Sequence, residues 1–484
     1  MTAAIPQPTH DPEADVPTSV EAAISPGPKA AVAAAETAPS PTVAPPPAPP
    51  VPPSRTPAPR AAAAPVDPGT DASLRAMDAT IAARPTAMLP HISIHCFPAS
   101  EASRTPFDAF AADRRLARAT VEIVPGGLSA AARRYAQEPT ANLVIVESPD
   151  TAEALLFELD RFAEVCDEGA QVVVVGAIND IALYRALKGR GVADYMLAPA
   201  RPLALVDVAS RLFNPDDAPA RIGRVIAFIG AKGGVGSSVI AQNVAWRLSE
   251  TSGADVLLLD MDFAFGASAI SCNVDAQRGM GDAMREVERL DGALLERLLT
   301  RRGKHLCLLA APASLDYDQE PHPADIERLI EVARRAMPIV VLDLPHHWNH
   351  WVRAALLQAD AVAVVTSAGL AAMRNASLLV EQLRTLRPND AEPRVVLNQF
   401  GAQRRNELDL KDVKATLNLT PGFSFDFDPK LFGAADAKGA MIVETPGGRK
   451  LGPTFDALAA DLTGRTKAPT KSGWSLQSLF SRKG

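Results

Sequence analysis

Nine residues near the middle of the chain have the composition of a phosphate-binding loop. Residues 230–238 read Gly-Ala-Lys-Gly-Gly-Val-Gly-Ser-Ser, between the apolar residues 225–229 and a helical pattern that begins at Val239. Glycines let successive backbone N–H groups converge on one anion, and a following helix adds the positive end of its dipole. The alternative is a tight turn without a ligand, but so many glycines before a helix cost stability unless the backbone must approach something closely. We therefore predict that this loop binds the phosphates of a nucleotide.

The lysine of this loop is displaced. A standard P-loop has a lysine directly before its final Ser or Thr, whereas here that position holds Ser237, and Lys232 lies five residues earlier. Ser238 occupies the position whose hydroxyl normally ligates Mg²⁺. Whether the protein hydrolyses a nucleotide or only holds one depends on this displacement.

Aspartates follow two later apolar runs. Asp260 and Asp262 come at the end of a predicted strand, and Asp343 follows four apolar residues, 339–342. Ligands of open α/β sheets bind beyond the carboxyl ends of the strands. Asp260 and Asp262 could orient a water and hold a metal or the lysine, and Asp343 has the form of the residue that helps to hold nucleotide-bound Mg²⁺. Ordinary acidic turn residues are the alternative.

Two further patterns allow more than one interpretation. Asn398 ends an apolar run, and its amide could both donate to and accept from an adenine edge, although a turn-forming Asn is equally consistent. His346 and His350 lie four residues apart and could chelate a metal on one helix face. Because no nearby Cys or Glu completes such a site, we favour packing and hydrogen bonding for these histidines.

The sequence pattern predicts that these residues are positioned by the strands and helices of two α/β domains. Short apolar runs alternate with helical patterns in residues 90–213 and again in 222–463, separated by a linker at 214–221. Runs without alternation of polar residues indicate parallel sheets covered on both faces, as in doubly wound folds of the flavodoxin type. The predicted strands are 91–97, 121–124, 142–146, 171–176 and 193–197, then 225–229, 254–260, 306–310, 339–343, 361–366, 394–399 and 423–427.

The two ends of the chain differ from these domains. Residues 1–88 hold about half of the 42 prolines and few large apolar side chains, so we predict a disordered Pro/Ala-rich arm that acts as a spacer or docks a partner. Residues 464–484 combine basic residues with a few apolar ones. This tail is either disordered or a short amphipathic helix that contacts a membrane.

Composition narrows the class of protein. The net charge of −7 gives no global electrostatic footprint for nucleic acid. The four cysteines are far apart, which argues against zinc and disulfides and suits a reducing compartment. The sequence has neither a signal-peptide pattern nor an apolar stretch long enough to span a membrane. We therefore expect a cytoplasmic protein.

Lys232 and the glycines after it resemble the MinD/ParA class of deviant P-loop ATPases, in which the early lysine is the signature. The resemblance is closer to the CpaE/TadZ branch, which serves assembly of Flp (tight-adherence) pili. Three segments carry this closer resemblance: the loop sequence at 230–238, Asp-Leu-Pro-His at 343–346 and Phe-Asp-Pro-Lys-Leu-Phe-Gly at 427–433. That branch has a receiver-like domain ahead of the ATPase, which agrees with residues 90–213. The resemblance covers most of residues 90–463.

The resemblance implies ATP and Mg²⁺ as ligands and a homodimer with nucleotide between the subunits. Lys232 would reach the phosphates of the partner subunit, and Asp262 would position water. The implied nucleotide contacts are Gly233, Gly234, Val235, Gly236, Ser237, Ser238 and, at the base, Asn398. The implied Mg²⁺ site comprises Ser238, Asp260 and Asp343.

Two departures from the family pattern weaken the expected chemistry. Ser237 replaces the second lysine and Ala231 replaces the first loop glycine, so we expect weaker binding and slow or no hydrolysis. In the first domain, the third strand ends at Glu147-Ser148, and Ala198 stands where a receiver has lysine. The resemblance therefore predicts a pseudo-receiver that docks or dimerises and is not phosphorylated.

The sequence thus predicts an ATP-binding factor that places pilus or secretion assembly components, at a cell pole or at the membrane. One alternative is a ParA-like partition ATPase that cycles on DNA, with a local basic patch from Arg384, Arg387, Arg404 and Arg405. Another is a structural scaffold that no longer binds nucleotide.

Overall fold

The structure is a computed structural model that describes residues 77–78, 80–81, 84–214, 222–312, 320–402 and 407–464. Most of the predicted arm, nearly all of the predicted linker and the tail from 465 lie outside these residues, so our expectations for them stay predictions. Within the described part, every helix is too short or too polar to cross a bilayer.

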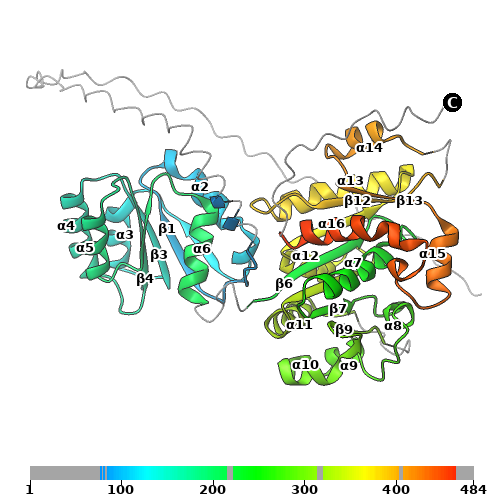
Figure 1. Cartoon of the computed structure of the whole chain (residues 1–484). Coiled ribbons are helices and arrows are strands. Elements are labelled where there is room, and N and C mark those ends of the chain that lie inside the picture. Colours follow the sequence, from blue (N-terminus) through cyan, green and yellow to red (C-terminus); the bar gives the residue numbers. More distant parts are fainter. Residues whose placement is uncertain are drawn as a thin grey trace, which may run out of the picture. The chain divides into compact units, whose positions relative to one another are not determined.

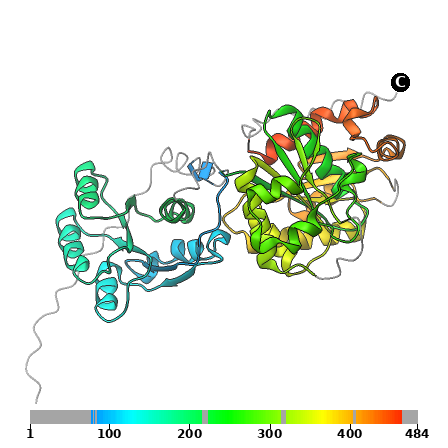
Figure 2. The ribbon, with the colours of Figure 1, turned by 90° about the horizontal axis from the view of Figure 1, so that it is seen from below.

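The residues predicted to form the first α/β domain contain a parallel five-stranded sheet in the order β2-β1-β3-β4-β5. This is the strand order of flavodoxin-like doubly wound folds. Helices cover both faces of the sheet (Figures 1 and 2), which explains why apolar residues predominate in its central strands. The strands are β1 (Ser93–Phe97), β2 (Thr120–Ile123), β3 (Leu143–Ser148), β4 (Gln171–Gly176) and β5 (Asp194–Leu197).

Two helices pack on one face of this sheet and three on the other. Seen from below in Figure 2, the three helices α3, α4 and α5 form a row on one side. The first pair is α2 (Thr105–Ala111) and α6 (Pro202–Phe213), and the row is α3 (Gly127–Tyr135), α4 (Ala152–Ala163) and α5 (Ile181–Gly189). The α/β class is confirmed for this part of the chain, whereas its receiver-like character stays a prediction.

The residues predicted to form the second domain contain an eight-stranded sheet in the order β13-β12-β11-β6-β10-β7-β9-β8. All neighbouring strands are parallel except β8 and β9. β8 was not predicted because its residues, Thr-Arg-Arg, have no apolar pattern. The strands are β6 (Arg224–Gly230), β7 (Val256–Asp260), β8 (Thr300–Arg302), β9 (Leu306–Leu309), β10 (Ile339–Leu344), β11 (Ala361–Thr366), β12 (Arg394–Phe400) and β13 (Phe423–Asp426).

Helices also cover both faces of the second sheet (Figure 1). In β6, Val225, Ala227 and Ile229 face one helix layer, and Ile226 and Phe228 face the other, so the strand reads as one apolar run. The helices are α7 (Ser237–Thr251), α8 (Ser268–Ser271), α9 (Met280–Arg285), α10 (Gly292–Leu298), α11 (Pro323–Ala336), α12 (His350–Gln358), α13 (Leu370–Leu386), α14 (Leu410–Leu417), α15 (Pro429–Asp436) and α16 (Gly452–Leu462).

Gly223, directly before β6, leaves no room for a side chain. A Cβ at this position would lie 1.8 Å from the carbonyl oxygen of Met337 and 2.8 Å from that of Arg334. Because both obstacles are backbone groups, we expect Gly223→Ala to lower the free energy of unfolding by roughly 3 kcal/mol. Urea unfolding measures this change. The matched control is Gly292→Ala, where nothing lies within 4 Å, and equal midpoints for the two variants would contradict the prediction.

Candidate functional site

The glycine-rich loop joins β6 to α7 at the carboxyl end of a central strand. β6 lies between β10 and β11, and α7 begins at Ser237. Gly234 and Gly236 have φ values of 80° and 83°, a backbone conformation that favours glycine. The loop therefore occupies the position where open α/β sheets bind ligands, as predicted.

Three side-chain amides hold the loop by its carbonyl oxygens. The hydrogen bonds run from Asn375 to the carbonyl of Ala231 (3.0 Å), from Gln399 to that of Gly234 (2.9 Å) and from Asn398 to that of Val235 (2.8 Å). Among the described hydrogen bonds, none uses the backbone N–H of Lys232, Gly233, Gly234 or Gly236 as its donor. The loop thus keeps a row of unused N–H donors, which is the chemistry that binds phosphate.

Asn398 has a role that the sequence did not suggest. Its amide nitrogen bonds the loop, and its Oδ1 atom is buried without a partner among the described residues. With Gln399 it lines a cavity of about 390 Å³ that extends past Gly236 to Phe432. A cavity of this size and mixed polarity suits the nucleoside of a bound nucleotide, and contact between Asn398 and the base stays a prediction.

Asp260 and Asp343 lie side by side at the ends of β7 and β10, because the register of these strands pairs them directly. Both are buried, with 2% and 3% of their surfaces exposed. Asp260 accepts hydrogen bonds from the backbone N–H groups of Asp262 (3.3 Å) and Ser268 (2.9 Å). Oδ1 of Asp343, in contrast, is buried without a partner among the described residues.

The electrostatics of this pair favour a cation. Burial raises the pKa of Asp260, and burial together with the Asp260 charge raises the pKa of Asp343, which a hydrogen bond from Ser238 opposes. Two buried carboxyl groups and one hydroxyl are hard oxygen donors of the kind that Mg²⁺ prefers. The predicted residues therefore fit the predicted metal. The described residues contain no group of three or more His, Cys, Asp and Glu that could hold a metal, so phosphate and water would have to complete this shell.

The two residues predicted to be catalytic lie at the edge of the site. Asp262 follows the end of β7, and its Oδ1 accepts a hydrogen bond from the N–H of Phe265 at 3.0 Å. Lys232 is exposed in the loop, and no ion pair is described for it. Their catalytic roles stay predictions.

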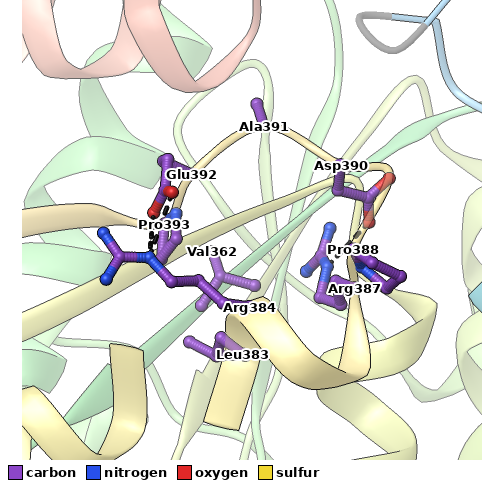
Figure 3. Close-up of a pocket in the computed structure, with 9 residues that line it drawn as sticks. All are labelled: Val362, Leu383, Arg384, Arg387, Pro388, Asp390, Ala391, Glu392 and Pro393. Atoms are coloured by element: carbon purple, nitrogen blue, oxygen red, sulfur yellow. Dashed lines mark hydrogen bonds and ion pairs between the residues drawn. The ribbon is translucent and has the colours of Figure 1, made fainter. Parts of the chain in front are cut away.

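Two of the four arginines of the predicted basic patch form ion pairs with neighbouring acidic side chains. Figure 3 shows a pocket of about 280 Å³ between the end of α13 and the turn before β12. Arg384 donates to both oxygens of Glu392, at 3.0 and 2.9 Å, and Arg387 donates to Asp390 at 2.8 Å. Burial lowers the pKa of Arg387 to about 10. Arg404 and Arg405 lie outside the described residues, so the DNA alternative stays a prediction.

Comparison with known proteins adds a family match. Residues 223–393, which include the loop and both buried aspartates, match the family model of an AAA domain. Two uncharacterized proteins of Mycobacterium tuberculosis are 28% identical over 169 residues, or 34% of this chain, and the chain spans only 46% of their length. The septum site-determining protein MinD of Thermotoga maritima is 27% identical over 203 residues, which cover 41% of this chain and 73% of MinD.

Solved structures include two similar proteins. A ParA family ATPase from Chlorobium tepidum is 22% identical with a TM-score of 0.45, over 49% of this chain and 98% of that one. The pilus assembly protein CpaE of Caulobacter crescentus is 45% identical with a TM-score of 0.26, over 26% of this chain and 97% of that one. For the second domain, the family match and the identity with MinD agree with the predicted resemblance to MinD/ParA ATPases.

Proposed function

We propose that the protein is an ATP-binding, MinD-like factor for assembly and placement of a Flp-type pilus, and that nucleotide controls its homodimerisation. The observation that supports nucleotide binding is the loop itself. Three amides hold its carbonyl groups, and four of its N–H groups (residues 232, 233, 234 and 236) donate no described hydrogen bond. Two buried carboxyl groups lie at the neighbouring strand ends. A turn without a ligand would need none of these features together.

Each part of the site has a task in this proposal. The N–H groups of residues 233–238 bind the phosphates, and the cavity beside Asn398 takes the nucleoside. Ser238, Asp260 and Asp343 hold Mg²⁺, whose charge offsets that of the phosphates when it is bound. Because Ser237 lacks the charge of a loop lysine, hydrolysis is slow or absent, and the output is the dimer itself.

The pilus role rests on the sequence resemblance to the CpaE/TadZ branch, and the similar Caulobacter crescentus protein is named as a pilus assembly protein. In this proposal the first α/β domain is a pseudo-receiver that docks or dimerises. It helps to place the protein at a cytoplasmic site such as the cell pole, with the basic tail as the candidate contact with the membrane.

Calorimetric titration of the full chain with Mg-ATP and Mg-ADP, combined with light scattering, tests nucleotide binding and dimerisation. We expect both nucleotides to bind and only ATP to double the mass. A chain that binds neither nucleotide at millimolar concentration would overturn the proposal.

Lys232→Ala tests the control of the dimer. Lys232 is exposed and has no described ion pair, so its loss leaves the loop of its own subunit intact while removing a cation that would reach the partner's phosphates. We expect this variant to bind Mg-ATP and remain monomeric by light scattering. Lys304→Ala, at another exposed lysine of the same domain, should dimerise like the unchanged protein. Normal ATP-dependent dimerisation of Lys232→Ala would contradict the prediction.

A further inference from the structure

The loop lacks a donor that its ligand needs. In a P-loop the lysine before the last Ser or Thr reaches the outer phosphates, and Ser237 is too short to do so. Its Oγ atom is buried without a partner among the described residues. If this loop binds ATP, as proposed above, the charge of the terminal phosphate must be met by another group of the same subunit or by the partner.

His346 lies against this loop. It follows β10, three residues after Asp343, and its ring lies where a side chain of residue 233 would point. Atoms Cε1 and Nε2 are 3.1 and 3.2 Å from the position that a Cβ of residue 233 would take, and Nδ1 is 3.7 Å from it. A side chain at residue 233 would displace the imidazole. The glycine at this position therefore permits close approach of His346 to the backbone that binds phosphate.

The ring nitrogens of His346 are not engaged elsewhere in the described structure. Its described ring contact is a stacked one with His347, with centroids 5.2 Å apart and an interplanar angle of 23°. No described hydrogen bond or ion pair involves its nitrogens. Neutral imidazole has one N–H donor and the protonated ring has two. His346 can thus donate a hydrogen bond to an anion in either state.

A groove beside the loop gives the ring access to a ligand. It has a volume of about 500 Å³ and runs from Gly230 and Ala231 to the side chains of His346, His347 and Gln382. Asn375, which also lines the groove, fixes the carbonyl of Ala231. The groove therefore borders the first residues of the loop, Gly230 and Ala231, whereas the nucleoside cavity borders later ones, Gly234 and Gly236.

We infer that His346 donates a hydrogen bond to the terminal phosphate of the bound nucleotide and takes over part of the task of the missing lysine. This inference rests on the proposed function and adds a phosphate-binding residue to it. Because the ring contacts the loop on the side of residues 230–233, away from the nucleoside cavity, its contribution should be felt by ATP and not by ADP.

Calorimetric titration of His346→Ala with Mg-ATP and Mg-ADP tests the inference. A hydrogen bond to a charged group is strong enough that we expect the affinity for ATP to fall about tenfold or more, while that for ADP changes less than about threefold. His350→Ala is the matched control, because His350 is an exposed histidine at the start of α12 with no described contact with Gly233 or with the groove. It should bind both nucleotides like the unchanged protein.

A second pair of variants separates this role from a structural one. In the Ser237→Lys background the restored lysine performs the same task, so His346→Ala should cost ATP affinity much less than it does alone. His346→Gln keeps a donor and should retain more ATP affinity than His346→Ala, and it replaces the alanine variant if that one fails to fold.

Three results would overturn the inference: equal losses of ATP and ADP affinity, no loss at all, or a loss of the same size in the Ser237→Lys background. Failure of the unchanged protein to bind any nucleotide would instead overturn the proposed function.

Discussion

Gly236→Ala is expected to lower the affinity for Mg-ATP by about a hundredfold. At a φ of 83° a residue with a Cβ is strained by roughly 1–2 kcal/mol. The Cβ would also lie 2.5 Å from the amide nitrogen of Asn398. Asn398 is buried and bonded to Val235, so it cannot move without releasing the loop. Strain and overpacking together, roughly 3 kcal/mol, favour loop conformations that do not bind phosphate.

Gly234→Ala is the matched control for this prediction. Its φ of 80° imposes the same strain, but no atom lies within 4 Å of its Cβ position. We expect a loss of affinity of about tenfold, so that the difference between the two variants measures the clash with Asn398. Calorimetric titration gives both affinities, and thermal unfolding shows whether each variant is folded. Equal affinities for the two variants would show that Asn398 does not fix the loop.

Asp343→Asn is expected to make the free protein more stable and to weaken Mg-ATP binding severely. The carboxyl group is buried and Oδ1 has no partner among the described residues, so removal of its charge relieves a desolvation cost. We expect the free energy of unfolding at neutral pH to rise by about 1–3 kcal/mol, or about 2–4 °C in melting temperature for each kcal/mol. Loss of a metal ligand lowers the affinity for Mg-ATP.

The pH dependence of this effect has a definite sign. The pKa of Asp343 is raised in the folded protein, so above the ordinary pKa of about 3.9 the folded state binds more protons than the unfolded one. The contribution of Asp343 to the free energy of unfolding of the free protein therefore falls as pH rises from that value toward the raised pKa. The advantage of Asp343→Asn should be largest at neutral pH and shrink toward pH 4.

Unfolding without Mg²⁺ or nucleotide across this pH range measures the stability change, and titration with Mg-ATP measures binding. Asp275→Asn, at an exposed aspartate of the same domain, should change neither quantity. A variant at Asp343 that is less stable than the unchanged protein at pH 7 would refute the argument from desolvation.

Most strands could be predicted from the sequence because burial on both faces gives them a run of consecutive apolar residues. β10 is buried at every residue and apolar at every residue except Asp343, as expected for a strand covered on both faces. β8 is short and polar, and α2 begins with Thr-Pro and offers only two buried aromatic side chains. Such elements depend on neighbours that become adjacent only after folding, so a local pattern could not predict them.

Some residues of the candidate site could likewise be predicted from the sequence, and others could not. Asp260 and Asp343 end apolar strands, so their meeting could be predicted before the register was known. Asn375 and Gln399 lie more than a hundred residues after the loop they hold. From the sequence, the spacing of His346 and His350 allows a metal pair, but packing and hydrogen bonding are favoured. Nothing in its spacing reveals that its ring lies on Gly233, because that contact depends on how two strand ends meet.

The amide bonds to the loop decide how much of the chain a minimal fragment needs. The region that matches the AAA domain ends at residue 393, before two of the three amides. A protein cut there would retain Asn375 but lose Asn398 and Gln399, and with them the bonds to residues 234 and 235. Peptide groups freed in this way can rotate and turn oxygen atoms toward the anion. Truncation at the edge of sequence similarity would therefore free the loop, and it would also remove β12, β13 and α16, which contribute apolar side chains to both cores of the domain.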